Sequence, residues 1–185
     1  MGLDYSSGCV NFRDVGEALE LIADASVFPQ QRLFRGGKID FVTDASTIKT
    51  PGTILNLRRG TDPQELPSTY AHFPASNDLE KYETSNREVR RWLNEIVSFF
   101  GDRSTEYPVL IHCTSGKDRT GVVVAALLTI VGIDRSLIVE EYLLSDGEVR
   151  SEWIEMALDG MADSTKYFNR VDLQTVVDRL VLEAT

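Results

Sequence analysis

In the first part of the chain, short apolar runs alternate with polar segments. This pattern predicts strands at 31–37, 52–58, 70–75 and 108–112, with a short helix at 43–49 between the first two strands. The run at 108–112 is almost wholly apolar, which is typical of a strand that is buried on both faces of a parallel sheet.

Beyond position 86 the apolar residues follow a helical spacing instead, and we expect an amphipathic helix from Asn86. Its apolar stripe, at a period of about 3.6 residues, consists of Val89, Leu93, Ile96, Val97 and Phe100. Further helices are expected at 120–131, after the capping residue Asp134, around 153–161 and at 171–183.

The strands come first and most of the helices follow. This order favours an α/β domain with a central, mainly parallel sheet flanked by helices. A chain of 185 residues fits a single domain, which we expect to span 1–185. Its longest apolar run, 122–131, is well short of the roughly 18 residues that span a bilayer, so no membrane insertion is expected.

The chain carries 29 acidic and 19 basic residues, which gives a formal net charge of −10. This balance argues against a nucleic-acid partner, and it means that any site for an anion must be locally basic. The two cysteines, Cys9 and Cys113, form no disulfide framework, and the first residues lack the pattern of a secretory signal. A reducing, cytoplasmic setting and a monomer are therefore the default expectations.

The segment "HCTSGKDRTG" at 112–121 places charged residues and a cysteine between the apolar strand and the apolar helix. A strand that enters a tight loop and then a helix is a common anion site, because the first helical amides lack partners and the N-terminus is partly positive. Gly116 tolerates the positive φ of such a loop, and Gly121 is expected to let the helix approach the sheet closely.

Within this loop Cys113 is the candidate nucleophile. A thiol beside a helix N-terminus and a cation is ionised at neutral pH, and a thiolate under a bound phosphate can attack phosphorus. Arg119 can hold two phosphate oxygens with its planar guanidinium group, and Thr120 can donate its hydroxyl to the sulfur. His112 is expected to organise the loop through a backbone hydrogen bond. A buried structural cysteine beside solvated cations is the alternative, but the strand–loop–helix combination favours the catalytic interpretation.

The same ten residues resemble the phosphate-binding loop of the cysteine-dependent protein tyrosine phosphatase superfamily. The "GKDRTG" part is similar to an atypical bacterial branch that acts on phosphotyrosine, phosphoserine or phosphoinositides. Further segments that resemble this branch are "NFRDVGE" at 11–17, "RLFRGGKI" at 32–39, "ILNLR" at 54–58 and "VGIDRSLIVEEYLLS" at 131–145. The chain departs from the branch at Glu17, where a glycine is usual, and at Gly36, where a serine is usual.

The resemblance implies a protein tyrosine phosphatase-like fold and two-step hydrolysis of phosphate monoesters without a metal or other cofactor. It assigns Cys113 as the nucleophile and Arg119 as the phosphate clamp, and it marks Lys117 and Asp118 as the distinctive pair of the branch. The expected phosphate-binding residues are Thr114, Ser115, Gly116, Lys117, Asp118, Arg119 and Thr120.

The general acid, which protonates the leaving oxygen and later activates water, is open among three aspartates. Relatives supply it from the loop after the strand that here reads "HFPASND", where Asp78 is the nearest carboxylate. Asp78 is preferred over Asp118, and Asp62 is the third candidate.

Residues outside the loop receive structural interpretations. Arg13 and Asp14 are expected to pair with each other beside the site, and Trp92 and Trp153 are expected to be packing residues. Cys9 is expected to be unreactive.

These inferences favour a protein tyrosine or dual-specificity phosphatase, whose partner is a phosphorylated protein. A phosphoinositide phosphatase is the first alternative: Lys117 adds a cation suited to multiply phosphorylated head groups, although the acidic chain disfavours an anionic membrane. Two further alternatives are a non-hydrolytic phosphate-binding module, which usually lacks the cysteine or the arginine, and arsenate reduction, which needs more thiols than Cys9 supplies.

Independence from metal is the first testable consequence. Both histidines are isolated and the acidic residues are dispersed along the chain, so the sequence offers no cluster of metal ligands. Phosphatase activity, measured with an activated aryl phosphate, is therefore expected to be unchanged after treatment with EDTA. Loss of activity on chelation that a divalent ion restores would contradict this prediction.

Overall fold

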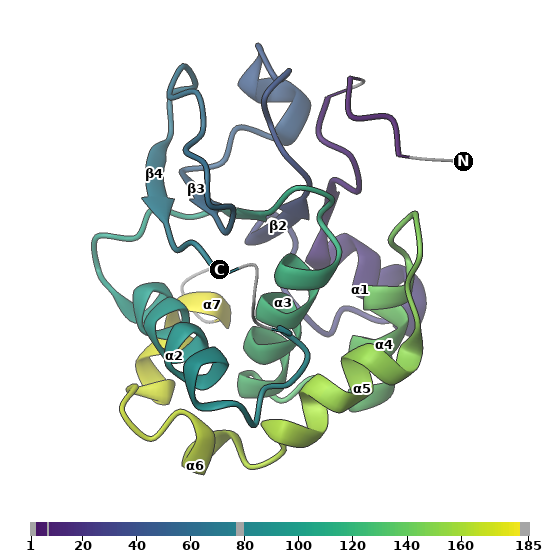
Figure 1. Ribbon diagram of the computed structural model, residues 1–185, viewed down its shortest axis with the longest axis vertical. Helices are drawn as coiled ribbons and strands as arrows, with labels where there is room; N and C mark the ends of the chain where they lie inside the picture. Colours follow the sequence, from purple (N-terminus) through teal and green to yellow (C-terminus); the bar gives the residue numbers. More distant parts are fainter. Residues whose placement is uncertain (1–2, 7, 77–79, 182–185) are drawn as a thin grey trace.

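The computed structural model describes residues 3–6, 8–76 and 80–181, and it shows a five-stranded sheet with helices packed against it (Figure 1). The strands are β1 (Arg13–Asp14), β2 (Leu33–Gly36), β3 (Thr53–Asn56), β4 (Thr69–His72) and β5 (Val109–His112). Their order is β1-β2-β5-β3-β4, and every neighbouring pair is parallel except β1 with β2. The sheet is therefore mainly parallel, and the apolar strand β5 lies at its centre as predicted.

The described part of the chain also contains a short 3₁₀-helix, η1 (Ala45–Ile48), where a short helix was predicted. The α-helices are α1 (Val15–Ala23), α2 (Arg87–Gly101), α3 (Asp118–Ile130), α4 (Arg135–Leu143), α5 (Ser151–Gly160), α6 (Ser164–Tyr167) and α7 (Leu173–Val181). The helices predicted beyond residue 86 are confirmed, with small differences at their ends. None of these helices is long and apolar enough to cross a membrane.

The elements β1, α1 and α6 were not predicted from the sequence. The helix α1 begins because the Asp14 side chain accepts hydrogen bonds from the amides of Gly16 (2.9 Å) and Glu17 (3.4 Å), which would otherwise lack partners. The expected pairing of Arg13 with Asp14 is thus wrong. Asp14 caps this helix, whereas Arg13 Nε lies 2.8 Å from Oε1 of Glu141 in α4.

The two faces of the sheet are buried in separate cores, because side chains alternate along a strand with a period of two. The side chains that face the helices include Leu33, Leu55, Val109 and Ile111. Those that face the other way are Phe34, Ile54 and Leu110, which pack with apolar residues of η1 and of the segment before it.

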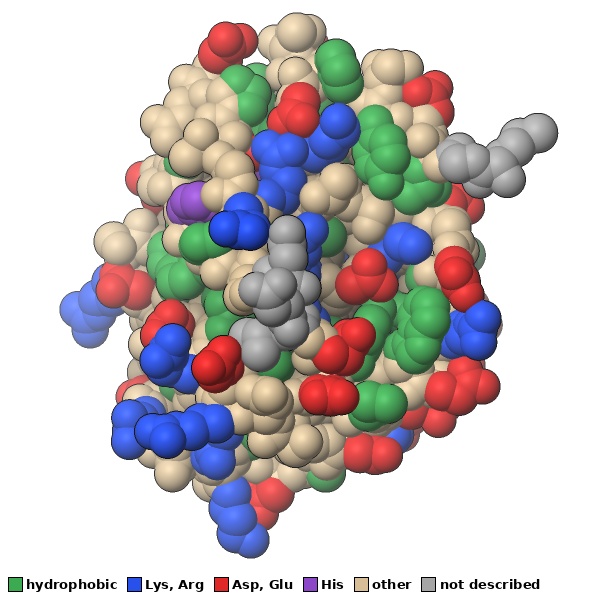
Figure 2. Space-filling view, in the orientation of Figure 1, with side chains coloured by type: hydrophobic (Ala, Val, Ile, Leu, Met, Phe, Trp, Pro, Cys, Tyr) green, Lys and Arg blue, Asp and Glu red, His purple; other side chains and the backbone are tan. Residues whose placement is uncertain are grey.

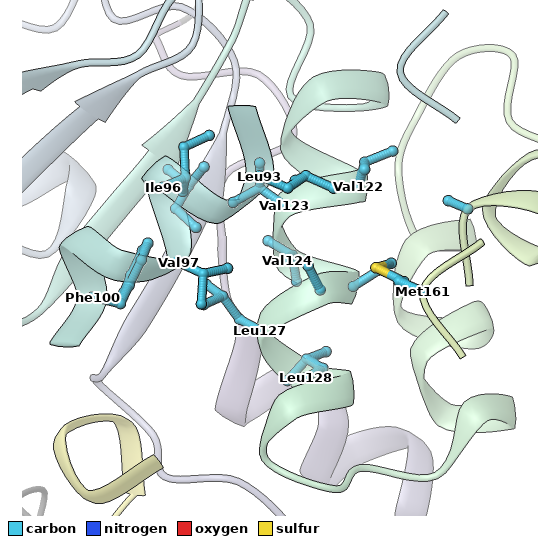
Figure 3. Close-up of a cluster of buried hydrophobic side chains, with 14 of the residues drawn as sticks. Leu93, Ile96, Val97, Phe100, Val122, Val123, Val124, Leu127, Leu128 and Met161 are labelled. Atoms are coloured by element: carbon cyan, nitrogen blue, oxygen red, sulfur yellow. The ribbon is translucent and has the colours of Figure 1, made fainter. Parts of the chain in front are cut away.

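The larger core contains the facing sides of α2 and α3, whose apolar side chains point toward each other (Figure 3). Leu93, Ile96 and Phe100 of α2 are wholly buried there, as are Val123 and Leu127 of α3. The predicted apolar stripe of α2 is thereby confirmed. By contrast, α3 is apolar on nearly all sides, because the sheet, α2, α4 and α5 all pack around it.

The carboxyl ends of β2, β5 and β3 meet at one edge of the sheet. In the parallel register, His112 at the end of β5 lies beside Gly36 of β2 and Asn56 of β3. Open parallel sheets bind their ligands at this edge, because the loops that follow the strands converge there. The segment 113–117, which joins β5 to α3, therefore lies in the middle of the edge.

The packing of α2 can be tested with two matched substitutions. Leu93 is fully buried, whereas Leu21 of α1 is 83% exposed. Leu93→Ala is expected to lower the free energy of unfolding by about 2–5 kcal/mol, because it removes contacts and leaves a cavity. Leu21→Ala is expected to change it by less than about 0.5 kcal/mol. Urea denaturation measures both values, and similar losses for the two variants would contradict the placement of α2 in the core.

Candidate active site

The loop between β5 and α3 is tight and lies directly against the end of β2. Gly116 has a φ of +72°, as expected, and a Cβ atom there would lie 2.5 Å from the carbonyl carbon of Gly36. Glycine is the residue that suits both conditions. The expectation for Gly121 is met only in part: a Cβ atom there would lie 2.8 Å from the ring of Tyr142 in α4 and 3.5 Å from Nη2 of Arg35 in β2, so the closest approach that this glycine allows is to α4.

Cys113 begins the loop and is 1% exposed. Its amide donates to the Gly36 carbonyl (3.4 Å), which ties the start of the loop to the end of β2. Cys9 occupies the space beside the same glycine, since a Cβ atom at position 36 would lie 2.4 Å from the Cys9 sulfur. The glycine at position 36, where the resemblance led us to expect serine, is therefore explained by the neighbouring thiol.

Arg119 reaches back over the loop from the first turn of α3. Its Nη1 donates to the Leu57 carbonyl just after β3 (3.1 Å), and its Nη2 donates to Thr114 Oγ1 (3.1 Å). The guanidinium group is thus held over the loop, as a phosphate clamp requires. The expected bond from Thr120 to the cysteine sulfur is not formed, because the buried Thr120 hydroxyl has no hydrogen-bond partner among the described residues.

Asp118 stands at the start of α3 and is joined to a pair of tyrosines. Its Oδ1 accepts a hydrogen bond from the Tyr82 hydroxyl (2.7 Å), which also lies 2.6 Å from the Tyr142 hydroxyl. Burial, and after it the hydrogen bonds to Tyr142 and Asp118, raise the pKa of Tyr82, so its hydroxyl keeps its proton. Asp78, the other candidate for the general acid, lies outside the described residues.

A cavity of about 510 Å³ opens beside the loop. It is lined by Glu80, Lys81, Tyr82, Glu83, Asp118, Arg119, Trp153 and Met156. The rings of Tyr82 and Trp153 pack with 5.9 Å between their centroids. Trp153 is therefore a wall of the cavity and not only a packing residue, whereas Trp92 is buried in the core as predicted.

The Asp62 side chain, the third candidate for the general acid, is bound to two basic side chains of the protein. Its carboxylate is 2% exposed and lies 2.7 Å from His112 Nε2 and 2.9 Å from Arg58 Nη2. A carboxylate enclosed in this way does not suit a group that must reach a leaving oxygen, so the geometry argues against Asp62 as the acid. The expectation for His112 is also corrected, because its side chain binds this carboxylate and not the backbone.

Basic groups gather around the loop although the chain has a net charge of −10. Lys117 Nζ donates to the Glu148 carbonyl (3.0 Å), and on another side of the loop Arg13 and Arg35 share the carboxylate of Glu141. On the face in Figure 2, acidic side chains are spread widely, whereas basic ones gather in the upper middle and at the lower left.

Among the described residues, no group of three or more His, Cys, Asp or Glu side chains could hold a metal ion.

Comparison with known proteins identifies the family. A model of the tyrosine phosphatase family matches residues 5–183, which is nearly the whole sequence. The chain therefore belongs to the tyrosine phosphatase family. The resemblance found in the loop and in the segments before and after it is confirmed.

Two curated proteins match parts of the chain. The triple specificity protein phosphatase PtpB of Mycobacterium tuberculosis is 40% identical over 80 residues, which is 43% of this chain and 24% of that protein. A tyrosine-protein phosphatase of Nostoc commune is 49% identical over 37 residues, which is 20% of this chain and 13% of that protein. Each match therefore spans less than a quarter of the length of the relative.

A solved structure shares the fold. The core catalytic domain of the PP-IP phosphatase SIW14 from S. cerevisiae, in complex with citrate, has a TM-score of 0.53 at 19% identity. The similarity covers 76% of this chain and 90% of that one. At this identity the likeness concerns the fold alone. The predicted fold class, an α/β domain with a mainly parallel sheet and a phosphatase-like arrangement, is confirmed.

The two cysteines are expected to differ in reactivity. Burial raises the pKa of the Cys9 thiol to about 12, so this thiol is almost wholly protonated near pH 8 and reacts slowly. Iodoacetamide is therefore expected to modify Cys113 alone in the native protein, more slowly when phosphate is present, and both cysteines after denaturation. Peptide mass spectrometry identifies the modified residue. Alkylation of Cys9 ahead of Cys113 would contradict this prediction.

Proposed function

We propose that residues 1–185 form a single cysteine-dependent phosphatase domain that hydrolyses phosphate monoesters, with phosphotyrosine in proteins as the main substrate. The observation that carries the proposal is the placement of Cys113, Asp118 and Arg119 on one loop and helix start, beside a cavity of about 510 Å³. Membership of the family and the names of the two curated relatives support it.

The reaction has two steps. In the first, the Cys113 thiolate attacks phosphorus, an S–P bond forms and the ester P–O bond breaks. Arg119 and the loop amides hold the non-bridging oxygens, and a carboxylic acid gives its proton to the leaving oxygen. In the second step, the resulting carboxylate takes a proton from water as the water oxygen attacks phosphorus. The S–P bond then breaks, inorganic phosphate departs and the thiolate is restored.

Asp118 and Asp78 are the candidates for the acid. Asp118 lines the cavity beside Arg119, and the Tyr82 hydroxyl orients its carboxyl group from 2.7 Å. Its position next to the phosphate clamp supports Asp118 as the donor to the leaving oxygen. Asp78, which the sequence favours, is the alternative that the kinetic test below must separate from it.

The cavity favours an aromatic leaving group. Tyr82, Trp153 and Met156 offer an apolar surface on which the ring of a phosphotyrosine can pack while its phosphate lies in the loop. A smaller phosphoserine fits the same space with fewer contacts, so dual specificity belongs to the proposal.

A thiolate nucleophile works only while it is reduced, which supports a reducing, cytoplasmic setting.

A phosphoinositide fits the cavity less well. Its additional phosphates would meet the carboxylates of Glu80, Glu83 and Asp118, which outnumber the two cations of the lining, Lys81 and Arg119. Lys117, which the sequence suggested for such phosphates, donates to the Glu148 carbonyl. These contacts support a phosphorylated protein as the substrate over a phosphoinositide.

The nucleophile is tested by Cys113→Ser. Turnover of p-nitrophenyl phosphate is expected to vanish, because a serine hydroxyl is not ionised at neutral pH, while inorganic phosphate still binds. Initial rates and calorimetry measure these two properties. Hydrolysis well above background in the variant would refute the covalent mechanism. A wild-type protein that binds phosphate but hydrolyses no ester would instead be a phosphate-binding module.

The acid is tested with a series of leaving groups. Removal of a general acid costs about 10²–10⁴ in rate, and the loss is greatest when the leaving group is a poor one that needs the proton. Asp118→Asn is therefore expected to slow hydrolysis of an alkyl phosphate far more than that of an activated aryl phosphate. Asp78→Asn is the comparison variant, and Asp159→Asn, in an exposed part of α5, is the control. A leaving-group dependence in Asp78→Asn alone would assign the acid to the other loop.

A further inference from the structure

Three neighbouring carbonyl groups of the loop have donors that come from distant parts of the chain. The carbonyls of residues 114–116 accept, in order, from the Lys38 amide (3.0 Å), from Asn11 Nδ2 (2.8 Å) and from Arg35 Nη2 (3.0 Å). All three donors lie in the segments "NFRDVGE" and "RLFRGGKI", which contain no catalytic group of the proposed reaction. The outer side of the loop is therefore fixed by the first 38 residues.

These bonds decide where the loop amides point. A peptide group is planar and trans, so its carbonyl and its N–H point in opposite directions. The carbonyls of residues 114–116 share their peptide groups with the amides of Ser115, Gly116 and Lys117. Within the described residues, none of these amides donates to a protein acceptor. Three successive N–H groups thus face the inside of the loop, where a bound anion can accept from all of them.

Asn11 is suited to its place behind the loop. While Nδ2 donates to the Ser115 carbonyl, Oδ1 accepts from the Asp146 amide (2.7 Å). The residue has a φ of +58°, a left-handed conformation that asparagine tolerates better than most residues do. Its side chain therefore bridges the loop and the segment that follows α4.

Arg35 is fully buried, and its charge is balanced inside the protein. Nη1 lies 2.5 Å from Glu141 Oε2, and Arg13 binds the other carboxylate oxygen of Glu141 at 2.8 Å. Burial opposes ionisation of Glu141, but the charges of Arg35 and Arg13 outweigh it and lower the pKa of this carboxyl group. The Glu141 carboxylate therefore lies between two guanidinium groups, and the Arg35 group is the one that reaches the Gly116 carbonyl.

A buried ionic cluster costs desolvation energy. Well-packed apolar residues of similar volume often stabilise a fold to the same extent or more. The Arg35 side chain does what an apolar one cannot, because it donates to the Gly116 carbonyl and brings positive charge to the loop. We propose that Asn11 and Arg35 are positioning residues for phosphate binding: they hold the carbonyls of Ser115 and Gly116 outward, so that the loop amides face the substrate phosphate. This inference deepens the proposed function and rests on it.

The test with Asn11 measures the affinity for orthovanadate by calorimetry. Asn11→Asp keeps the acceptor for the Asp146 amide but cannot donate to Ser115, and Asn11→Gly removes the side chain without adding charge. Both variants are expected to bind vanadate at least about tenfold more weakly, and to lose up to about 10² in kcat, since misdirected amides are lost oxyanion donors. Urea denaturation of the same samples shows whether a change in stability accompanies the effect.

Asn94→Asp is the matched control. Asn94 Nδ2 donates to the carbonyls of Arg90 (2.8 Å) and Tyr167 (3.2 Å), and neither of these residues is hydrogen-bonded to residues 113–117. This variant loses the same kind of bond, so it is expected to change stability and leave the vanadate affinity unchanged. If the Asn11 variants lose stability but bind vanadate as tightly as the wild type, the proposal is wrong.

Arg35 provides a second, independent test. Arg35→Lys keeps a positive charge and a donor, whereas Arg35→Met keeps only the approximate volume. Vanadate affinity and kcat are expected to fall strongly in Arg35→Met and to recover in part in Arg35→Lys. Partial recovery of vanadate affinity in Arg35→Lys, measured beside the stability of both variants in urea, separates a role in phosphate binding from a purely structural one. Equal vanadate affinities in the two folded variants and the wild type would overturn the role of Arg35. If Arg35→Met does not fold, the vanadate affinities of Arg35→Lys and of the two Asn11 variants test the proposal instead.

Failure of this inference and failure of the proposed function can be told apart, because vanadate binding requires no turnover. A wild-type protein that binds vanadate but hydrolyses no phosphate ester would refute the proposed function and still allow the comparison of variants. An active wild type whose Asn11 and Arg35 variants bind vanadate normally would refute the inference alone. A wild type that binds no vanadate would overturn both.

Discussion

The direction of the peptide groups at residues 114–117 is the constraint on which the rest of the site depends. An anion held by backbone amides needs several successive N–H groups on one side of a loop, which places the matching carbonyls on the other side, where each needs a donor. Lys38, Asn11 and Arg35 supply those donors. Gly116 follows from the same constraint, because its positive φ and its contact with Gly36 leave no room for a side chain.

The same arrangement explains how a chain with a net charge of −10 can hold an anion. The positive charge is concentrated where the loop needs it, with Arg119 over the loop, Lys117 at the start of α3 and the Arg13–Glu141–Arg35 cluster behind it. The long-range field of the acidic surface is screened by salt over about 10 Å, whereas these groups act at contact distance. Acidic side chains elsewhere then affect the rate of substrate approach more than the strength of binding.

Local signals in the sequence predicted most of the fold and the centre of the site. The apolar strand β5, the loop and the apolar helix α3 are contiguous, so their pattern alone indicates where Cys113 and Arg119 lie. The network around Arg35 could not be predicted in this way, since its partner Glu141 is 106 residues away and the pairing appears only when α4 packs beside the loop. The segment 13–14 was misassigned for the same reason: neighbours in sequence looked like a pair, whereas each residue has a different partner in space. Two local signals could have revealed α1: the capping pattern of Asp14 with Glu17, and the helical spacing of the apolar residues Val15, Ala18 and Leu19.

The central claim is that the amides of this loop form the anion site and that Cys113 lies beneath it. The most direct measurement is a crystal structure of the wild-type protein with orthovanadate. The account predicts vanadium bonded to the Cys113 sulfur, with its oxygens about 2.7–3.2 Å from the amide nitrogens of Ser115, Gly116 and Lys117 and from the Arg119 guanidinium group. Vanadate bound elsewhere on the molecule, or a loop whose carbonyls point toward the anion, would contradict it.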